Sequence, residues 1–109
     1  MCLTIVIPSK NRPSLLRRSV QFWANYDFNV LIIDGSDLSQ QEWIKPFLSE
    51  KFIYIHKKSS FPVQLSLAAE YISTKYCTLV ADDDFILPSS LRISIDFLEK
   101  NPDFVAVNG

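Results

Sequence analysis

Residues 29–37, NVLIIDGSD, decide the fold class of this chain. The apolar side chains of residues 30–33 follow one another without polar interruption, which is typical of a strand buried on both faces of a parallel sheet. Asp34 closes the run, and Gly35, Ser36 and Asp37 then form a turn signal. We therefore predict a buried strand over 29–34 that ends in a carboxylate at the edge of a sheet.

Similar apolar runs recur along the chain, separated by segments with helical periodicity. We expect further strands at residues 3–8, 52–56, 76–81 and 104–107. Apolar spacing and start signals predict helices from Pro13 onward, over 39–49, over 63–73, and after a cap at Ser89 or Ser90. Strands that alternate with helices indicate an α/β fold, a Rossmann-like parallel sheet with helices on both faces.

Composition restricts the class of partner. The chain has 109 residues, 48% of them hydrophobic, which suits one small domain with a real core. The net charge of -1 gives no electrostatic reason to expect nucleic acid or an anionic membrane as the main partner. Gly35 and Gly109 are the only glycines, so the sequence has no glycine-rich phosphate loop.

Short apolar runs and the cysteines bear on location. No run is long enough to span a bilayer, and no signal-peptide pattern follows Met1, so we expect a cytoplasmic protein without a membrane span. Cys2 and Cys77 lie in apolar runs, where we expect buried free thiols of a reducing compartment. The sequence holds no Cys/His motif that indicates zinc.

Three consecutive carboxylates stand in TLVADDDFILP, residues 78–88, directly after a predicted strand. Like charges repel, and an ionised Asp is seldom buried without a partner, so Asp82, Asp83 and Asp84 require an explanation. A solvated loop, or favourable charge near the start of a helix, would explain them without a ligand. A hard divalent cation, Mg²⁺ or Mn²⁺, is the alternative, because it prefers oxygen ligands and often shares them with substrate phosphates.

The strand order favours the ligand interpretation. Open α/β sheets bind ligands outside the carboxyl ends of their strands. Polar residues follow three predicted strands here, at positions 9–12, 34–37 and 82–84. We therefore expect a site at this edge that holds a metal together with a nucleotide diphosphate.

Three ordered segments resemble glycosyltransferase family 2, whose members are GT-A-fold nucleotide-sugar transferases. They read LTIVIPSKNRPSLLRRSV over residues 3–20, FNVLIIDGSD over 28–37 and YCTLVADDDFILPSSL over 76–91. The resemblance covers nearly the whole chain. It implies transfer of a sugar from a nucleotide-diphosphate sugar, a UDP- or GDP-sugar, to an acceptor, usually with inversion and with Mg²⁺ or Mn²⁺.

The resemblance also implies roles for individual residues. Pro8 and Ser9 would contact the nucleoside, with Arg12 close by. Asp34 would accept a hydrogen bond from the base.

The same resemblance assigns the Asp triplet to a DxD-type motif. Asp82 would contact the ribose or diphosphate, and Asp83 would hold the metal. Asp84 completes a literal D-x-D with Asp82, so the register stays open by one residue and Asp84 is a second metal candidate.

Some positions depart from the family pattern. Ala81 and Gly35 stand where members often carry an acidic residue, and Gln64 stands in a region where many carry a basic contact to the diphosphate. The resemblance places the acceptor site and the catalytic base beyond residue 109. We therefore expect residues 1–109 to be the nucleotide-sugar-binding half of a GT-A-like domain, truncated at its C-terminus and able to associate with the missing region or another chain.

Other functions remain open at this point. A nucleotidyltransferase also uses metal carboxylates on an α/β sheet, but it would usually show a basic, glycine-rich loop after the first strand. A phospho-acceptor receiver domain would place its acidic residues after different strands. A catalytically inactive nucleotide-binding or interaction module with the same fold is the non-enzymatic alternative.

Overall fold

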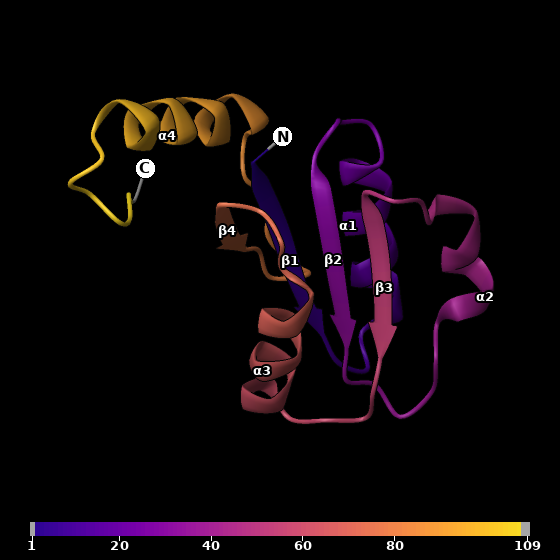
Figure 1. The fold of residues 1–109 in the computed structure, drawn as a ribbon. Helices are drawn as coiled ribbons and strands as arrows, with labels where there is room; N and C mark the ends of the chain where they lie inside the picture. Colours follow the sequence, from indigo (N-terminus) through magenta and orange to yellow (C-terminus); the bar gives the residue numbers. More distant parts are fainter. Residues whose placement is uncertain (1, 108–109) are drawn as a thin grey trace.

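The computed structural model describes residues 2–107, and Met1, Asn108 and Gly109 lie outside the described part. Its four strands form one parallel sheet in the order β3-β2-β1-β4 (Figure 1). The strands are β1 (Leu3–Ser9), β2 (Asn29–Asp34), β3 (Phe52–His56) and β4 (Tyr76–Leu79). The predicted α/β class with a parallel sheet is therefore confirmed.

The register of the strands aligns their carboxyl ends. Ser9 of β1 lies beside Asp34 of β2, and Asp34 lies beside His56 of β3. On the other side of β1, Val6 pairs with Leu79 at the end of β4. Because all four strands run in the same direction, the loops that follow them meet at one edge of the sheet.

Helices cover both faces of this sheet, as predicted. Helix α1 (Pro13–Trp23) lies behind the sheet and α3 (Phe61–Tyr71) lies in front of it in Figure 1. Helix α2 (Gln41–Ile44), the 3₁₀ turn η1 (Lys45–Phe47) and α4 (Pro88–Lys100) complete the chain. The predicted helix over 39–49 is thus a short helix and a 3₁₀ turn, because Pro46 cannot donate the hydrogen bond that would continue α2.

The two faces bury different halves of the apolar runs. The face behind the sheet packs Ile5, Ile7 and Ile32 against Val20 and Trp23 of α1. The front face packs its own set of residues: Val6, Leu31, Ile33 and Ala68 of α3. Successive residues of β1 and β2 therefore point into two separate cores, which explains why these strands are apolar without alternation.

Prolines set the starts of three helices. Pro13, Pro62 and Pro88 each occupy the first or second position of a helix, where the missing N–H has no partner to lose. As a result α3 begins at residue 61, two residues before its predicted start. Helix α4 begins at Pro88 with Leu87 in the cap position, so the predicted cap at Ser89 or Ser90 is wrong.

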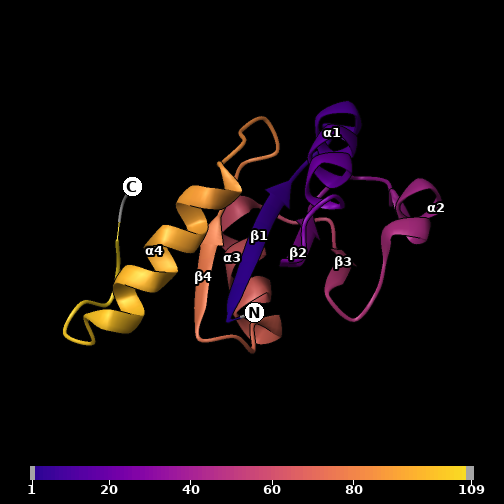
Figure 2. The same cartoon turned by 90° about the horizontal axis from the view of Figure 1, so that it is seen from above.

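The predicted fifth strand is wrong. Residues 104–107 are irregular, and Val105 is 95% exposed. They do not pair with β4, the edge strand of the described sheet, and a strand needs a hydrogen-bonded neighbour to exist. Residues 105–107 instead line a groove of about 380 Å³ between α4 and the first residues of β1 and β4, and Figure 2 shows α4 at that side of the sheet.

The cysteine prediction holds only in part. Both cysteines are free thiols, but Cys77 is exposed and Cys2 is half-buried, so neither is fully buried. Cys77 is exposed because β4 is an edge strand with an uncovered face, on which Leu79 is also half exposed. In residues 2–107 no helix is long and apolar enough to cross a membrane.

Candidate functional site

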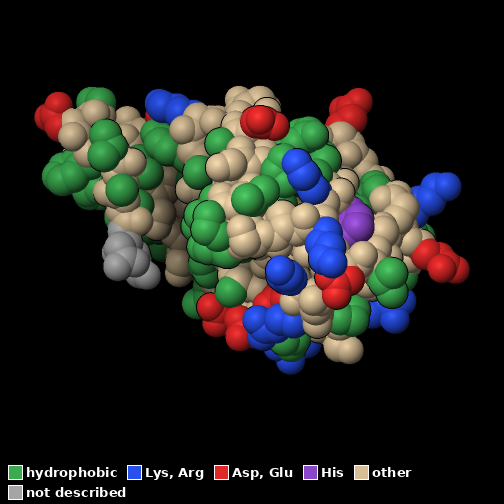
Figure 3. All heavy atoms as spheres, turned by 90° about the horizontal axis from the view of Figure 1, so that it is seen from below, with side chains coloured by type: hydrophobic (Ala, Val, Ile, Leu, Met, Phe, Trp, Pro, Cys, Tyr) green, Lys and Arg blue, Asp and Glu red, His purple; other side chains and the backbone are tan. Residues whose placement is uncertain are grey.

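Polar side chains gather where the strands of the sheet end. Figure 3 views this edge and shows Lys and Arg side chains on it, with acidic side chains between them. The basic residues that follow β1 and β3 are Lys10, Arg12, Lys57 and Lys58. The acidic residues come from the ends of β2 and β4. The predicted convergence of three strand ends on one edge is therefore present.

Asp82 is a buried carboxylate at this edge that is held by several hydrogen bonds. Its side chain is only 3% exposed, although a carboxylate normally stays in water. Ser9 donates a 2.8 Å hydrogen bond to Oδ2, and the guanidinium of Arg12 lies 3.0 Å from Oδ1. The backbone carbonyl of Asp82 accepts a 2.8 Å hydrogen bond from the Ser19 hydroxyl of α1. These contacts join the loop after β4 to β1 and α1, and they compensate the buried charge.

Asp83 and Asp84 differ from Asp82 because they face solvent. The Asp83 side chain is 49% exposed, and its Oδ2 lies 3.2 Å from Nη2 of Arg12. Asp84 is exposed too, and its amide closes a turn by donating to the carbonyl of Ala81. The turn thus buries the first carboxylate of the triplet and presents the other two outward.

A hollow of about 320 Å³ lies beside the buried carboxylate. Residues from four segments line it: Pro8, Ser9, Lys10, Arg12, Phe61, Gln64, Ala81 and Asp82. Four of the five nucleotide-site candidates, Pro8, Ser9, Arg12 and Asp82, thus lie together on one concave surface. The larger groove under α4 is lined mainly by apolar side chains and lies away from these carboxylates.

Asp34 lies apart from this hollow, below the turn that follows β2. Its side chain is fully buried, with Oδ2 accepting a 2.5 Å hydrogen bond from Tyr54 and Oδ1 accepting a 3.0 Å bond from the amide of Ser36. Burial and the hydrogen bond to Asp34 raise the pKa of the Tyr54 hydroxyl to about 12. In this geometry Asp34 shapes the turn, and contact with a base remains a prediction.

The turn after β2 is tied to the loop after β1. The Ser36 hydroxyl accepts a 2.7 Å hydrogen bond from the amide of Asn11, and the Asn11 side chain accepts a 3.0 Å bond from the amide of Asp37. Asn11 adopts a φ of 54°, a left-handed conformation that Asn tolerates better than most residues. His56 adds a 2.8 Å hydrogen bond from Nε2 to the carbonyl of Ser36. His56 therefore has a structural partner at the end of β3.

Gln64 of α3 has a structural role that sequence reasoning missed. It is 3% exposed, and its Nε2 donates to the carbonyls of Ser9 at 2.7 Å and Ile33 at 3.0 Å. A Cβ at Gly35 would come within 2.6 Å of the Ser59 carbonyl and 3.0 Å of Gln64 Nε2, so this close approach requires glycine. A polar residue four positions before the buried Ala68 was the available signal.

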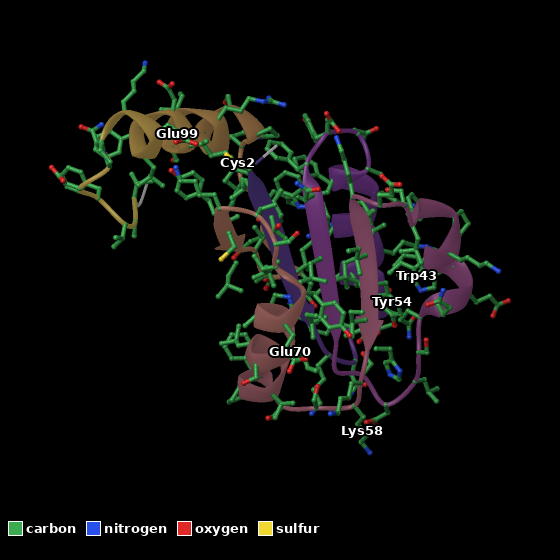
Figure 4. All side chains as sticks on the ribbon, in the orientation of Figure 1. Cys2, Trp43, Tyr54, Lys58, Glu70 and Glu99 are labelled. Atoms are coloured by element: carbon green, nitrogen blue, oxygen red, sulfur yellow. The ribbon has the colours of Figure 1, made fainter. Side chains whose placement is uncertain are left out.

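Side chains farther from the hollow have structural surroundings. Figure 4 shows Tyr54 and Trp43 on the side of the sheet where α2 lies, and Lys58 at the carboxyl edge. The indole N–H of Trp43 donates to Gln40 at 2.7 Å, and Arg17 lies 5.1 Å over its ring. Lys58 is 3.5 Å from Asp37 in an exposed ion pair, which fits a solvated loop.

The donor chemistry at the exposed end of the triplet fits a hard cation. Within residues 2–107 no group of three or more His, Cys, Asp or Glu side chains is arranged to hold a metal ion. Asp83 and Asp84 nevertheless offer exposed carboxylate oxygens, and Mg²⁺ usually takes one or two carboxylates and completes its shell with water and substrate phosphates. Asp82 is less available, because Ser9 and Arg12 engage both of its oxygens.

A comparison with protein families bears on the functional class. The family described as glycosyl transferase family 2 matches residues 4–109, which is nearly the whole chain. The chain belongs to glycosyl transferase family 2. A search of curated proteins returned no match. Family membership supports a glycosyltransferase-like function and implies binding of a nucleotide-sugar donor.

The geometry offers one concave surface for a ligand at the carboxyl edge of the sheet. The hollow of this family 2 domain lies at the carboxyl ends of β1 and β4, the edge at which open α/β sheets take their ligands. Ala81 and Asp82 form one side of it, and Phe61 and Gln64 of α3 form another. The edge therefore offers a hydroxyl, a guanidinium, carboxylates and one exposed aromatic ring to a single bound molecule.

Proposed function

We propose that this family 2 domain is the donor-binding part of an inverting, divalent-metal-dependent glycosyltransferase, which moves a sugar from a UDP- or GDP-sugar to an acceptor. The observation that supports this most directly is the split within the Asp triplet. Asp82 is buried against Ser9 and Arg12 beside the hollow, while Asp83 and Asp84 are exposed next to it. One short turn thereby combines a buried carboxylate with two exposed carboxylates that can ligate a metal.

The residues in and beside the hollow contact different parts of a bound nucleotide diphosphate. Pro8 and Ser9 contact the nucleoside, and Asp82 orients the Ser9 hydroxyl through their 2.8 Å hydrogen bond. Asp83 and Asp84 would hold Mg²⁺ or Mn²⁺. When bound there, the ion supplies positive charge that offsets the charge developing on the leaving diphosphate.

Arg12 places a second positive charge beside the same phosphates. Its guanidinium is half exposed and lies at the mouth of the hollow, so one N–H can reach an incoming oxygen. Family members often carry a basic diphosphate contact in the region that Gln64 occupies here. Gln64 binds two backbone carbonyls instead, so we assign the basic contact to Arg12.

Asp34 has an indirect role in this proposal. Its carboxylate is fully buried and bonded to Tyr54 and to the amide of Ser36. It therefore fixes the turn over 35–37, which borders the loop after β1 through Asn11. A base that packs against this turn would be affected by Asp34 only through the backbone that Asp34 positions.

A cytoplasmic location also stays a prediction of the sequence.

Calorimetry tests the proposal. UDP and then GDP are titrated into the folded domain with and without Mn²⁺, using the native protein, Asp83→Ala and Asp96→Ala. Asp96 is a matched control, because it is an exposed Asp in an ion pair with Lys100 on α4, away from the hollow. We expect Mn²⁺-dependent binding of one nucleotide that is lost in Asp83→Ala and kept in Asp96→Ala.

The opposite results are equally informative. Absence of binding of either nucleotide by a folded domain would refute donor binding by this chain and favour an inactive module of the same fold. Binding that does not depend on Mn²⁺, or that survives in Asp83→Ala, would refute the metal role of Asp83 while leaving nucleotide binding in place.

A further inference from the structure

One guanidinium bridges two carboxylates of different character. Nη1 of Arg12 lies 3.0 Å from Oδ1 of Asp82, and Nη2 lies 3.2 Å from Oδ2 of Asp83. Asp82 is 3% exposed, whereas Arg12 and Asp83 are 46% and 49% exposed. Arg12 therefore supplies positive charge to the same Asp83 carboxylate that the proposed function assigns to a divalent cation.

The two halves of this bridge differ in how firmly they are held. Asp82 is fixed by the Ser9 hydroxyl and, through its carbonyl, by Ser19 of α1. Removing a partner from such a buried carboxylate is costly. The contact between Arg12 and Asp83 joins two half-exposed side chains at the longer distance, and exposed pairs of this kind contribute little. The Asp83 half is therefore the one that can open.

We propose that Arg12 is an exchangeable counter-cation for Asp83: it neutralises Asp83 when no metal is bound, and it gives up this contact when a divalent cation arrives. This inference rests on the proposed function for the identity of the metal site. The other half of the guanidinium stays on Asp82 throughout. The released N–H groups then face the hollow, where a phosphate oxygen of the bound nucleotide accepts their hydrogen bond.

The positive charge of Arg12 has opposite effects on two ligands, the divalent cation and the diphosphate. Because Arg12 lies 3.2 Å from Asp83, it would repel a divalent cation held by Asp83 and would compete for one of its oxygen ligands. A diphosphate bound beside the metal is attracted by the same guanidinium. Arg12 consequently weakens binding of the metal alone and strengthens binding of the metal together with the nucleotide. It thereby favours joint binding of the two over a metal bound without substrate.

The test compares Arg12→Gln with Arg18→Gln. Gln at position 12 keeps an N–H group for Asp82 but removes the charge. Arg18 is the matched control, since its guanidinium lies 5.2 Å over the ring of Phe85, one residue after the triplet. It carries the same charge nearby and makes no hydrogen bond to Asp83 among the described contacts. Mn²⁺ alone is added to each protein, and its affinity is measured from the broadening of the amide signals of residues 82–85.

We expect Arg12→Gln to tighten binding of Mn²⁺ alone by about tenfold and Arg18→Gln to change it by less than about threefold. In an Asp83→Asn background the Arg12 substitution should have no effect, because the shared carboxylate is gone. In calorimetry with Mn²⁺ present, Arg12→Gln should weaken binding of UDP or GDP by about tenfold.

Several outcomes would overturn the inference. Unchanged or weaker Mn²⁺ binding in Arg12→Gln would show that Arg12 does not compete with the metal. Equal effects of Arg12→Gln and Arg18→Gln on the Mn²⁺ affinity would show that any nearby positive charge acts in this way and that the bridge has no specific role. Arg12→Lys serves if Arg12→Gln unfolds: its ammonium can stay on Asp82 but cannot bridge both carboxylates, so Mn²⁺ should still bind more tightly than in the native protein.

The result stays separable from the proposed function. If the native domain binds neither UDP nor GDP with Mn²⁺, donor binding fails. The broadening by Mn²⁺ alone still decides whether Arg12 and a divalent cation compete for Asp83. Conversely, Mn²⁺-dependent nucleotide binding with no change in metal affinity on Arg12→Gln would keep the proposed function and refute the exchange.

Discussion

The Tyr54 hydroxyl donates a 2.5 Å hydrogen bond to Oδ2 of Asp34, and this pair joins β3 to β2 beneath the carboxyl edge of the sheet. Tyr54 also accepts a 2.8 Å hydrogen bond from the amide of Gln40, just before α2. The amide of Ser36 completes the shell of Asp34. The buried carboxylate of Asp34 thus accepts hydrogen bonds from Tyr54 and Ser36, which belong to separate segments. The Tyr54–Asp34 pair therefore links several segments at this edge.

Replacing Tyr54 with Phe should lower the free energy of unfolding by about 1–3 kcal/mol, because it leaves a buried carboxylate oxygen without its donor. Urea denaturation at neutral pH measures this change. Tyr26→Phe is a suitable control, since that ring is partly exposed, and it should alter stability by less than about 0.5 kcal/mol. Equal stability of Tyr54→Phe and the native protein would mean that Asp34 is satisfied in another way.

The raised pKa of Tyr54 predicts a loss of stability at high pH. An ordinary tyrosine loses its proton near pH 10, whereas the folded-state pKa is about 12. Between these values the unfolded chain binds fewer protons than the folded one, so the free energy of unfolding falls as pH rises. Below pH 10 the contribution of Tyr54 is complete.

Denaturation of the native protein and Tyr54→Phe at about pH 9 and about pH 11.5 isolates this effect from the other titrating groups. The stability difference between the two proteins should shrink at the higher pH. A difference that stays constant across this interval would contradict a raised pKa at Tyr54.

Gln64→Leu should destabilise the domain by about 1–3 kcal/mol, because the carbonyls of Ser9 and Ile33 lose a buried donor. Leu has a similar volume, so the change tests the hydrogen bonds and not the packing. Ser66→Ala on the exposed side of the same helix is the control and should be nearly neutral. Denaturant titration measures both, and a neutral Gln64→Leu would show that these bonds contribute no net stability.

Asp82→Asn and Asp83→Asn should separate folding from binding. Asp82→Asn should cost about 1–3 kcal/mol, because it disturbs a buried carboxylate that two donors serve. Asp83→Asn should cost less than about 0.5 kcal/mol, because only an exposed ion pair is lost. Thermal unfolding measures the stability of the two variants, and Mn²⁺-dependent binding of UDP or GDP measures their ability to bind the nucleotide. A strongly destabilised Asp83→Asn would contradict a purely ligand-binding role for this carboxylate.

Sequence periodicity predicted most of the fold. The strands β1, β2 and β3 lie within one residue of their predicted bounds, because each is a continuous apolar run that only burial on two faces explains. The segment over 104–107 has the same local composition and is not a strand. In the described part of the chain its backbone has no neighbouring strand to pair with, and local propensity cannot supply one.

The sequence predicted where the candidate site lies better than it predicted which of its residues contact one another. Strand direction placed Ser9, Arg12 and the Asp triplet on one edge, and the structure brings Ser9 and Arg12 onto Asp82. Asp34 lies at the same edge as predicted, and its side chain is buried under its own turn with Tyr54 as partner. The structural role of Gln64 was missed, because its partners are backbone carbonyls 55 and 31 residues away in the chain.

The sequence by itself determined the α/β class, the parallel direction of the strands, the two-sided burial and the edge on which polar residues collect. These follow from the order of apolar runs and turn residues, which is local information. Only the tertiary structure decided that Asp82 is buried while Asp83 and Asp84 are exposed, and that one Arg12 serves two carboxylates. Adjacent residues with identical side chains acquire different roles because their surroundings come from β1, α1 and α3, and those distant segments meet only in the folded chain.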